Sequence, residues 1–111
     1  MARLTTSMLV GALTRQAQAA GGFAAVLAKG DATAGAVLVI LAERGQKSSV
    51  LERLLQPEGR YLWQDIGQSA QDEAQLNALI ERRRKYDPDL WVVELDIPNG
   101  ERFAAEMNSM T

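Results

Sequence analysis

Residues 36–43, AVLVILAE, decide how the rest of the chain must be arranged. Seven consecutive apolar residues, several of them β-branched, favour a strand, and a strand that is apolar on both faces belongs in the centre of a covered sheet. A second short apolar run, FAAVLAK at residues 23–29, precedes it, and GDATAG at residues 30–35 lies between the two. We therefore expect two strands joined by a hairpin loop, with the second strand central.

Helical spacing is found on the N-terminal side of these strands. Residues 6–20 place side chains at spacings of three and four on one face, which predicts an amphipathic helix. Gly21 and Gly22 end this helix, because glycine readily takes the left-handed conformation found at helix ends. The face that we expect to be buried comprises Leu9, Ala12, Leu13, Gln16, Ala17 and Ala20.

Two more strands are expected after the central run. Gly45 marks a turn, and residues 48–56, SSVLERLLQ, follow as a strand, although VLERLLQ also fits two helical turns. Residues 57–59, PEG, form the next turn, and residues 60–66, RYLWQDI, are typical of a short strand.

A second helix and a last strand complete the pattern. Ser69 and Asp72 form a capping box that starts the helix, and Asp87-Pro88 ends it. Residues 90–97, LWVVELDI, then alternate as a strand. The expected apolar faces are Leu76, Leu79 and Ile80 on the helix and Trp91, Val93, Leu95 and Ile97 on the strand.

This order of elements, α-β-β-β-β-α-β, predicts an α+β fold. The links between successive strands are short, which favours mostly antiparallel pairing. We expect one sheet of about five strands with two helices packed on it, in a single domain over residues 1–111. Residues 101–107, ERFAAEM, are expected to add one closing helical turn, and the tail over about residues 107–111 to fray.

Composition excludes several classes of function. The chain has 111 residues and a formal net charge of -2, and it contains neither cysteine nor histidine. It therefore has no disulfide, no thiolate or histidine metal site, and no cysteine or serine–histidine catalytic set. The near balance of charge argues against a protein built as a whole to coat nucleic acid. We expect no catalytic residue and no cofactor.

The composition and the N-terminus also bear on location. A chain without cysteine fits a reducing compartment. The apolar patch MLVGAL at residues 8–13 is shorter than the apolar region of a secretory signal, and no stretch approaches the roughly 18 apolar residues of a transmembrane helix. We therefore expect a cytoplasmic protein without membrane attachment.

The glycine loop resembles half of a phosphate-binding loop. Gly30 and Gly35 enclose four residues, but Ala36 and Val37 stand where the lysine and the hydroxyl of that motif belong. The run that follows is a strand, whereas phosphate binding needs a helix N-terminus at this place. We expect no nucleotide, and we expect Asp31 to accept hydrogen bonds from backbone N–H groups of a turn, with a role in a site as the open alternative.

Two further groups of residues are candidates for chemistry. Arg82, Arg83, Arg84 and Lys85 are consecutive cations that could contact nucleic-acid phosphates, although consecutive helical positions wrap around the helix and also suit its negative end. Glu94 and Asp96 share one strand face and, with Asp31 and Glu43, could hold magnesium for phosphodiester cleavage. The alternative for the acids is an outward face that keeps the sheet soluble.

The stretches GGFAAVLAKGDATAGAVLVIL and DPDLWVVELD, together with Trp63, resemble a small bacterial family known only as domain of unknown function 1491. The resemblance covers almost the whole chain and rests on residues 21–23, 30–35 and 87–94 in addition to that tryptophan. It implies a compact single domain in a bacterial cytoplasm, and it brings no activity, cofactor or catalytic residue.

These observations favour a non-catalytic module that binds another protein or a second copy of itself. The candidate partner surface lies where the second helix ends and the last strand begins, and it comprises Arg84, Tyr86, Asp87, Asp89 and Trp91. The alternatives are nucleic-acid binding through the basic helix end and magnesium-dependent cleavage through the acids.

Overall fold

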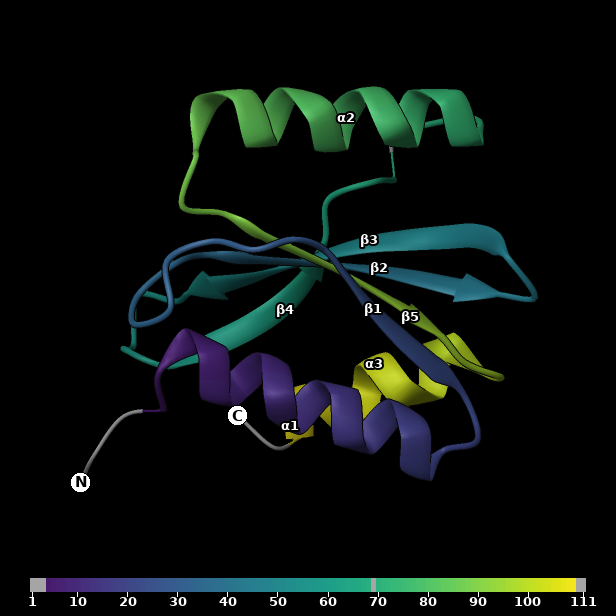
Figure 1. The fold of residues 1–111 in the computed structure, drawn as a ribbon, viewed down its shortest axis with the longest axis horizontal. Helices are drawn as coiled ribbons and strands as arrows, with labels where there is room; N and C mark the ends of the chain where they lie inside the picture. Colours follow the sequence, from purple (N-terminus) through teal and green to yellow (C-terminus); the bar gives the residue numbers. More distant parts are fainter. Residues whose placement is uncertain (1–3, 69, 110–111) are drawn as a thin grey trace.

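The computed structural model describes residues 4–68 and 70–109 of the chain (Figure 1). Its elements in chain order are α1 (Thr6–Ala19), β1 (Phe23–Ala28), β2 (Val37–Glu43), β3 (Gln46–Leu55), β4 (Tyr61–Asp65), α2 (Glu73–Tyr86), β5 (Trp91–Asp96) and α3 (Gly100–Ser109). Figure 1 shows α2 on one side of the sheet and α1 with α3 on the other. The α+β class is confirmed, and the described residues form one helix more than the sequence predicted.

The five strands form one sheet in the order β1-β5-β2-β3-β4. β2 and β5 run parallel, and the other neighbouring pairs run antiparallel, as in β1–β5 and β3–β4. The expected hairpin between the first two strands is wrong, because β5 lies between β1 and β2. Residues 29–36 therefore cross over the start of β5 instead of turning tightly back.

β2 is the central strand that its sequence predicted, and all residues from Val37 to Ala42 are buried. Alternate side chains of a strand point to opposite faces, so this one strand supplies both cores. The core beneath α1 and α3 includes Val39, Leu41, Trp91, Val93, Leu95 and Ile97, which confirms the alternation expected for the last strand. The core beneath α2 includes Leu38, Ile40, Val50, Leu76, Ile80 and Val92.

The first helix is rotated relative to the expected face. Its buried residues are Thr6, Val10, Leu13 and Ala17, whereas Leu9, Ala12 and Gln16 are half-buried and Ala20 is exposed. Both faces satisfy helical spacing, and contact with the sheet selects one of them. The helix ends as predicted, since Gly21 has a φ of 85°.

The structure shows which secondary structure residues 46–55 adopt and which residue caps α2. Residues 46–55 form a strand, so the alternative of helical turns there is wrong. The N-cap of α2 is Asp72, whose carboxylate accepts a hydrogen bond of 2.9 Å from the backbone N–H of Gln75. The expected cap Ser69 lies outside the described residues.

The C-terminal helix is longer than the single turn expected. α3 runs from Gly100 to Ser109, with Phe103 and Met107 buried against the sheet. Residues 107–109 are therefore helical where the sequence suggested a frayed tail. None of the helices in the described part of the chain has the length and apolar character needed to cross a bilayer.

Candidate partner surface at the end of α2

The glycine loop lies directly on the start of β5. The backbone N–H of Asp31 donates to the carbonyl of Asp89 at 3.0 Å, and the indole Nε1 of Trp91 donates to the carbonyl of Asp31 at 2.8 Å. A Cβ placed on Gly30 or Gly35 would lie 2.0 or 2.4 Å from the Asp89 carbonyl oxygen. These two glycines are needed because the loop backbone passes so close to the backbone of another segment.

The Asp31 carboxylate is directed at its own loop. One of its oxygens accepts hydrogen bonds from the backbone N–H groups of Thr33 at 3.2 Å and Ala34 at 2.8 Å. An aspartate that satisfies loop amides in this way holds the turn together. The interpretation of Asp31 as a backbone acceptor agrees with these contacts.

The basic helix end divides into one internal cation and three external ones. Arg83 forms a two-pronged ion pair with Glu52 on β3, with one hydrogen bond at 2.7 Å, and the Glu52 side chain is only 8% exposed. This hydrogen bond raises the pKa of Arg83 above its ordinary value. Arg82, Arg84 and Lys85 are exposed. Arg83 therefore ties α2 to the sheet, whereas its three basic neighbours face solvent, and the nucleic-acid contact through Arg82, Arg83, Arg84 and Lys85 stays a prediction.

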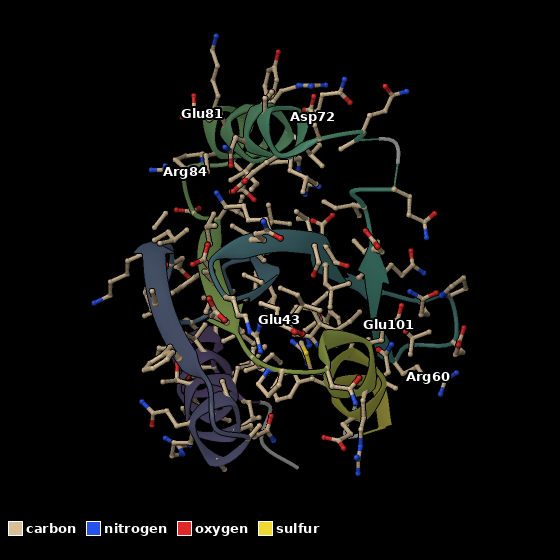
Figure 2. All side chains as sticks on the ribbon, turned by 90° about the vertical axis from the view of Figure 1, so that its right-hand side faces the viewer. Glu43, Arg60, Asp72, Glu81, Arg84 and Glu101 are labelled. Atoms are coloured by element: carbon tan, nitrogen blue, oxygen red, sulfur yellow. The ribbon has the colours of Figure 1, made fainter. Side chains whose placement is uncertain are left out.

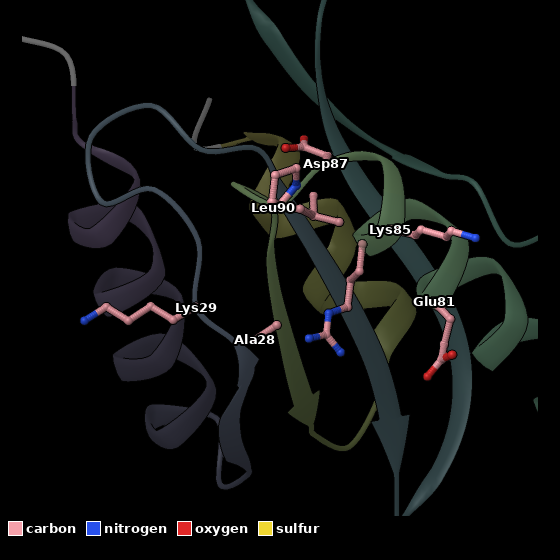
Figure 3. A pocket seen from close by; sticks show the side chains of 8 residues that line it. Ala28, Lys29, Glu81, Lys85, Asp87 and Leu90 are labelled. Carbon is pink, nitrogen blue, oxygen red and sulfur yellow. The ribbon is translucent and has the colours of Figure 1, made fainter.

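A pocket of about 430 Å³ opens beside the last turns of α2 (Figure 3). Figure 3 shows Glu81 and Lys85 on α2, Ala28 and Lys29 at the end of β1, and Lys29 and Lys85 extending away from each other at opposite sides. Figure 2 shows Glu81 and Arg84 on the side of α2 that lies above β1. The complete lining is Ala28, Lys29, Glu81, Arg84, Lys85, Asp87, Pro88 and Leu90.

The five residues of the candidate partner surface play different parts. Tyr86 is 79% exposed, and Arg84 and Asp89 are also exposed. Asp87 turns the chain from α2 into β5, because its carboxylate accepts from the N–H of Asp89 at 3.1 Å and its carbonyl from that of Leu90 at 3.2 Å. Trp91 is only 4% exposed and belongs to the core, so its indole is not available to a partner.

Sequence reasoning did not include Lys29 and Glu81 in this surface. Lys29 lies more than fifty positions before Arg84 in the chain, and only the crossover of the glycine loop brings it beside α2. The sequence did indicate that Glu81 lies near Arg84, because residues three apart on a helix share a face and Glu81 precedes Arg84 by three. We call Lys29, Arg84, Lys85 and Tyr86 the α2-end surface.

Three of the four acids proposed for magnesium accept hydrogen bonds from the backbone, as Asp31 does in its own loop. The Asp96 carboxylate accepts from the backbone N–H groups of Arg44 at 3.0 Å and Gly45 at 2.8 Å, and so holds the turn between β2 and β3. Glu43 accepts from the N–H of Asn99 at 3.2 Å. Glu94 lies between Ala25 and Ile40 in the sheet register. Within residues 4–68 and 70–109 no group of three acidic residues is placed to hold a metal ion.

Comparison with known proteins agrees with this description. A family model described as "Protein of unknown function (DUF1491)" matches residues 4–105. An NMR structure of a DUF1491 family protein from Caulobacter crescentus CB15 is 38% identical, with a TM-score of 0.79 over 90% of this chain and 91% of that one. No protein with a curated description matches the chain.

Two further solved structures are similar. A crystal structure of a DUF1491 family protein from the same organism is 40% identical, with a TM-score of 0.75 over 83% of this chain and 86% of that one. The solution structure of protein Atu0922 from A. tumefaciens is 34% identical, with a TM-score of 0.74 over 88% of this chain and 89% of that one. The stretches behind the sequence resemblance meet in the structure where the glycine loop rests on Asp89 and Trp91.

Proposed function

The chain belongs to the DUF1491 family, whose description states no function, and from this premise we propose that it is a non-catalytic protein-interaction module that acts through the α2-end surface. The observation that carries the proposal is the position of Tyr86, which is 79% exposed between the exposed cation Lys85 and the start of β5. Tyrosine and arginine are, with tryptophan, the residue types that contribute most to binding at protein interfaces. An exposed tyrosine at this helix end, on the same turn as the exposed Arg84, is therefore suited to a partner.

The charges around the pocket indicate the kind of partner. Lys29, Arg84 and Lys85 contribute three positive charges to the lining, against two negative charges from Glu81 and Asp87. A partner segment that presents a carboxylate to Arg84 and an apolar or aromatic side chain to Tyr86 complements this surface. The absence of cysteine supports a reducing compartment, so we also propose a cytoplasmic location.

The test is retention of partner proteins from a cell extract by the wild-type chain and by the Arg84→Ala/Tyr86→Ala variant. Both side chains are exposed, so the substitutions leave the core intact and the loss of a retained protein reports on the surface. The matched control is Leu55→Ala/Arg60→Ala at the turn between β3 and β4, where both residues are also exposed. If the double variant retains every partner that the wild type retains, the α2-end surface is not the partner site.

We propose nucleic-acid binding as the alternative, because Lys29 lines the same pocket as Arg84 and Lys85, and Arg82 on the same helix is also exposed. The log of the affinity for duplex DNA is then expected to fall by about 0.9 per phosphate contact for each decade of salt. Four cations limit the slope to about −3.6. A chain that shows no salt-sensitive retention on DNA or RNA at low ionic strength excludes this alternative.

A further inference from the structure

The strand β1 forms one edge of the sheet and carries an unusual group of exposed apolar side chains. Phe23, Val26 and Leu27 are 76%, 49% and 52% exposed. Seven large hydrophobic side chains are exposed in the described residues, and five of them lie between residues 4 and 27. This segment contains α1 and most of β1, together with the residues just before each. These two elements pack against one another (Figure 1). The exposed apolar surface is therefore concentrated on this side of the molecule, which is typical of an interaction site.

The two edges of the sheet differ in how their backbone groups are satisfied. At the β4 edge, the side chain of Asn108 accepts from the N–H of Trp63 at 2.7 Å and donates to its carbonyl at 3.2 Å. In this way α3 occupies the middle of that edge. β1 is paired on one side only, with β5. Its six residues, FAAVLA, contain neither a charge nor a proline, two of the features that prevent an edge strand from pairing.

We propose that β1 pairs antiparallel with β1 of a second copy of this chain, so that the two sheets join across a two-fold axis. A two-fold arrangement is the commonest closed assembly, and it uses the same segment in both copies. Because β1 is uncharged, its self-pairing brings no like charges face to face. The inference does not rest on the α2-end surface.

Charge also selects the antiparallel direction. A parallel pair would place the Lys29 residues of the two copies side by side, whereas an antiparallel pair centred near Ala25 separates them by about 26 Å. In the antiparallel arrangement centred on Ala25, Lys29 of one copy lies opposite residue 21 of the other, so the two lysines do not meet.

Side-chain size is also complementary in this register. When Ala25 lies opposite Ala25 of the second copy, Phe23 faces Leu27 and Ala24 faces Val26 across the axis, so large apolar side chains meet near each end and small ones at the centre. The β1–β5 register shifts between Val26 and Ala28, which limits the regular pairing to about five residues in each copy. An interface of this size is small, and we expect it to dissociate in the micromolar range or above.

The test is the mass of the chain in solution, by sedimentation equilibrium or light scattering, between about 1 μM and about 1 mM, the range that brackets such an interface. The wild type is expected to rise from 12.1 kDa toward twice that mass. Ala25→Lys and Ala25→Glu, at an exposed position, are each expected to stay monomeric because like charges meet at the axis. An equimolar mixture of the two is expected to regain the dimer mass.

The matched control is Leu55→Lys, which places a lysine at another exposed apolar residue and is expected to dimerise like the wild type. If circular dichroism shows that the Ala25 variants do not fold, Phe23→Lys at a 76% exposed position takes their place. The proposal is overturned if the wild type keeps the monomer mass up to about 1 mM. That result is expected if β1 pairs with a segment of another protein and not with a second copy of this chain. It is also overturned if the β1 variants dimerise as Leu55→Lys does. The Arg84→Ala/Tyr86→Ala variant is expected to keep the dimer mass, which separates this proposal from the proposed function.

Discussion

Replacing Arg83 with alanine is expected to destabilise the protein by loosening α2 from the sheet. Removing one partner of a fully buried ion pair costs about 3–5 kcal/mol, because the other charge stays buried without compensation. Glu52 is 8% exposed, but the side chain of Arg83 is 33% exposed, so water reaches the gap and lowers the expected loss to about 2–3 kcal/mol. Only Leu76 and Ile80 of α2 are buried, each contributing about 1.5–3 kcal/mol, so the ion pair is a large share of its attachment.

Two further variants separate the ion pair from other causes. Arg84→Ala removes the neighbouring exposed arginine and is expected to change stability by less than about 0.5 kcal/mol. The double variant Glu52→Leu/Arg83→Met replaces the pair by apolar groups of similar size. It is expected to stay within about 1 kcal/mol of the wild type, because such replacements are often neutral or stabilising.

The measurement is urea unfolding followed by circular dichroism at neutral pH, with the free energy of unfolding extrapolated to water. If Arg83→Ala lies within about 0.5 kcal/mol of the wild type, the ion pair does not hold α2 and the reasoning is refuted. A double variant as unstable as Arg83→Ala would also contradict it, since the loss would then not come from an uncompensated charge.

Gly30→Ala is expected to lower the free energy of unfolding by about 3 kcal/mol or more, measured by thermal unfolding, because the new Cβ would lie 2.0 Å from a backbone oxygen. Gly11→Ala is expected to raise it by about 0.5–1 kcal/mol, because Gly11 lies inside a helix and its new Cβ would meet only the end of a flexible side chain. Asn108→Ala is expected to cost about 1–3 kcal/mol and to speed hydrogen exchange at the Trp63 amide, and an unchanged exchange rate would show that the edge is protected otherwise. Asp31→Ala is expected to cost about 1–2 kcal/mol in urea unfolding through two lost hydrogen bonds, and a loss of partner retention by the folded variant would instead assign this carboxylate to a site.

The elements with strong periodic patterns were predictable from the sequence. The length of α3 was underestimated, although its sequence contains a helical pattern. Phe103 and Met107 are four residues apart and both face the core, which is a helical signal already present in the sequence. The preceding Asn99-Gly100 favoured a turn, and Asn99 does take a left-handed φ of 59°. The turn and the helix are both present, because the turn residue stands directly before the first turn of α3.

The pairing of the strands could not be predicted from local patterns. Two apolar runs joined by a glycine-rich loop look the same whether they form a hairpin or enclose a third strand. The choice depends on residues 91–96, which lie more than fifty positions later and pair with both runs at once. The same long-range pairing places Lys29 beside Arg84, and this is why the composition of the pocket was not foreseen.

The sequence by itself determined the α+β class, the central place of β2 and the two-sided burial of the sheet, because these follow from the local spacing of apolar residues. It also excluded thiol and histidine chemistry, since composition limits what any fold can assemble. Only the tertiary structure decided that Arg83 turns inward to Glu52 while Arg84 stays outside, and that one sheet edge is covered while the other is open. Those properties depend on which segments distant in the sequence come into contact, and local sequence patterns do not specify these contacts.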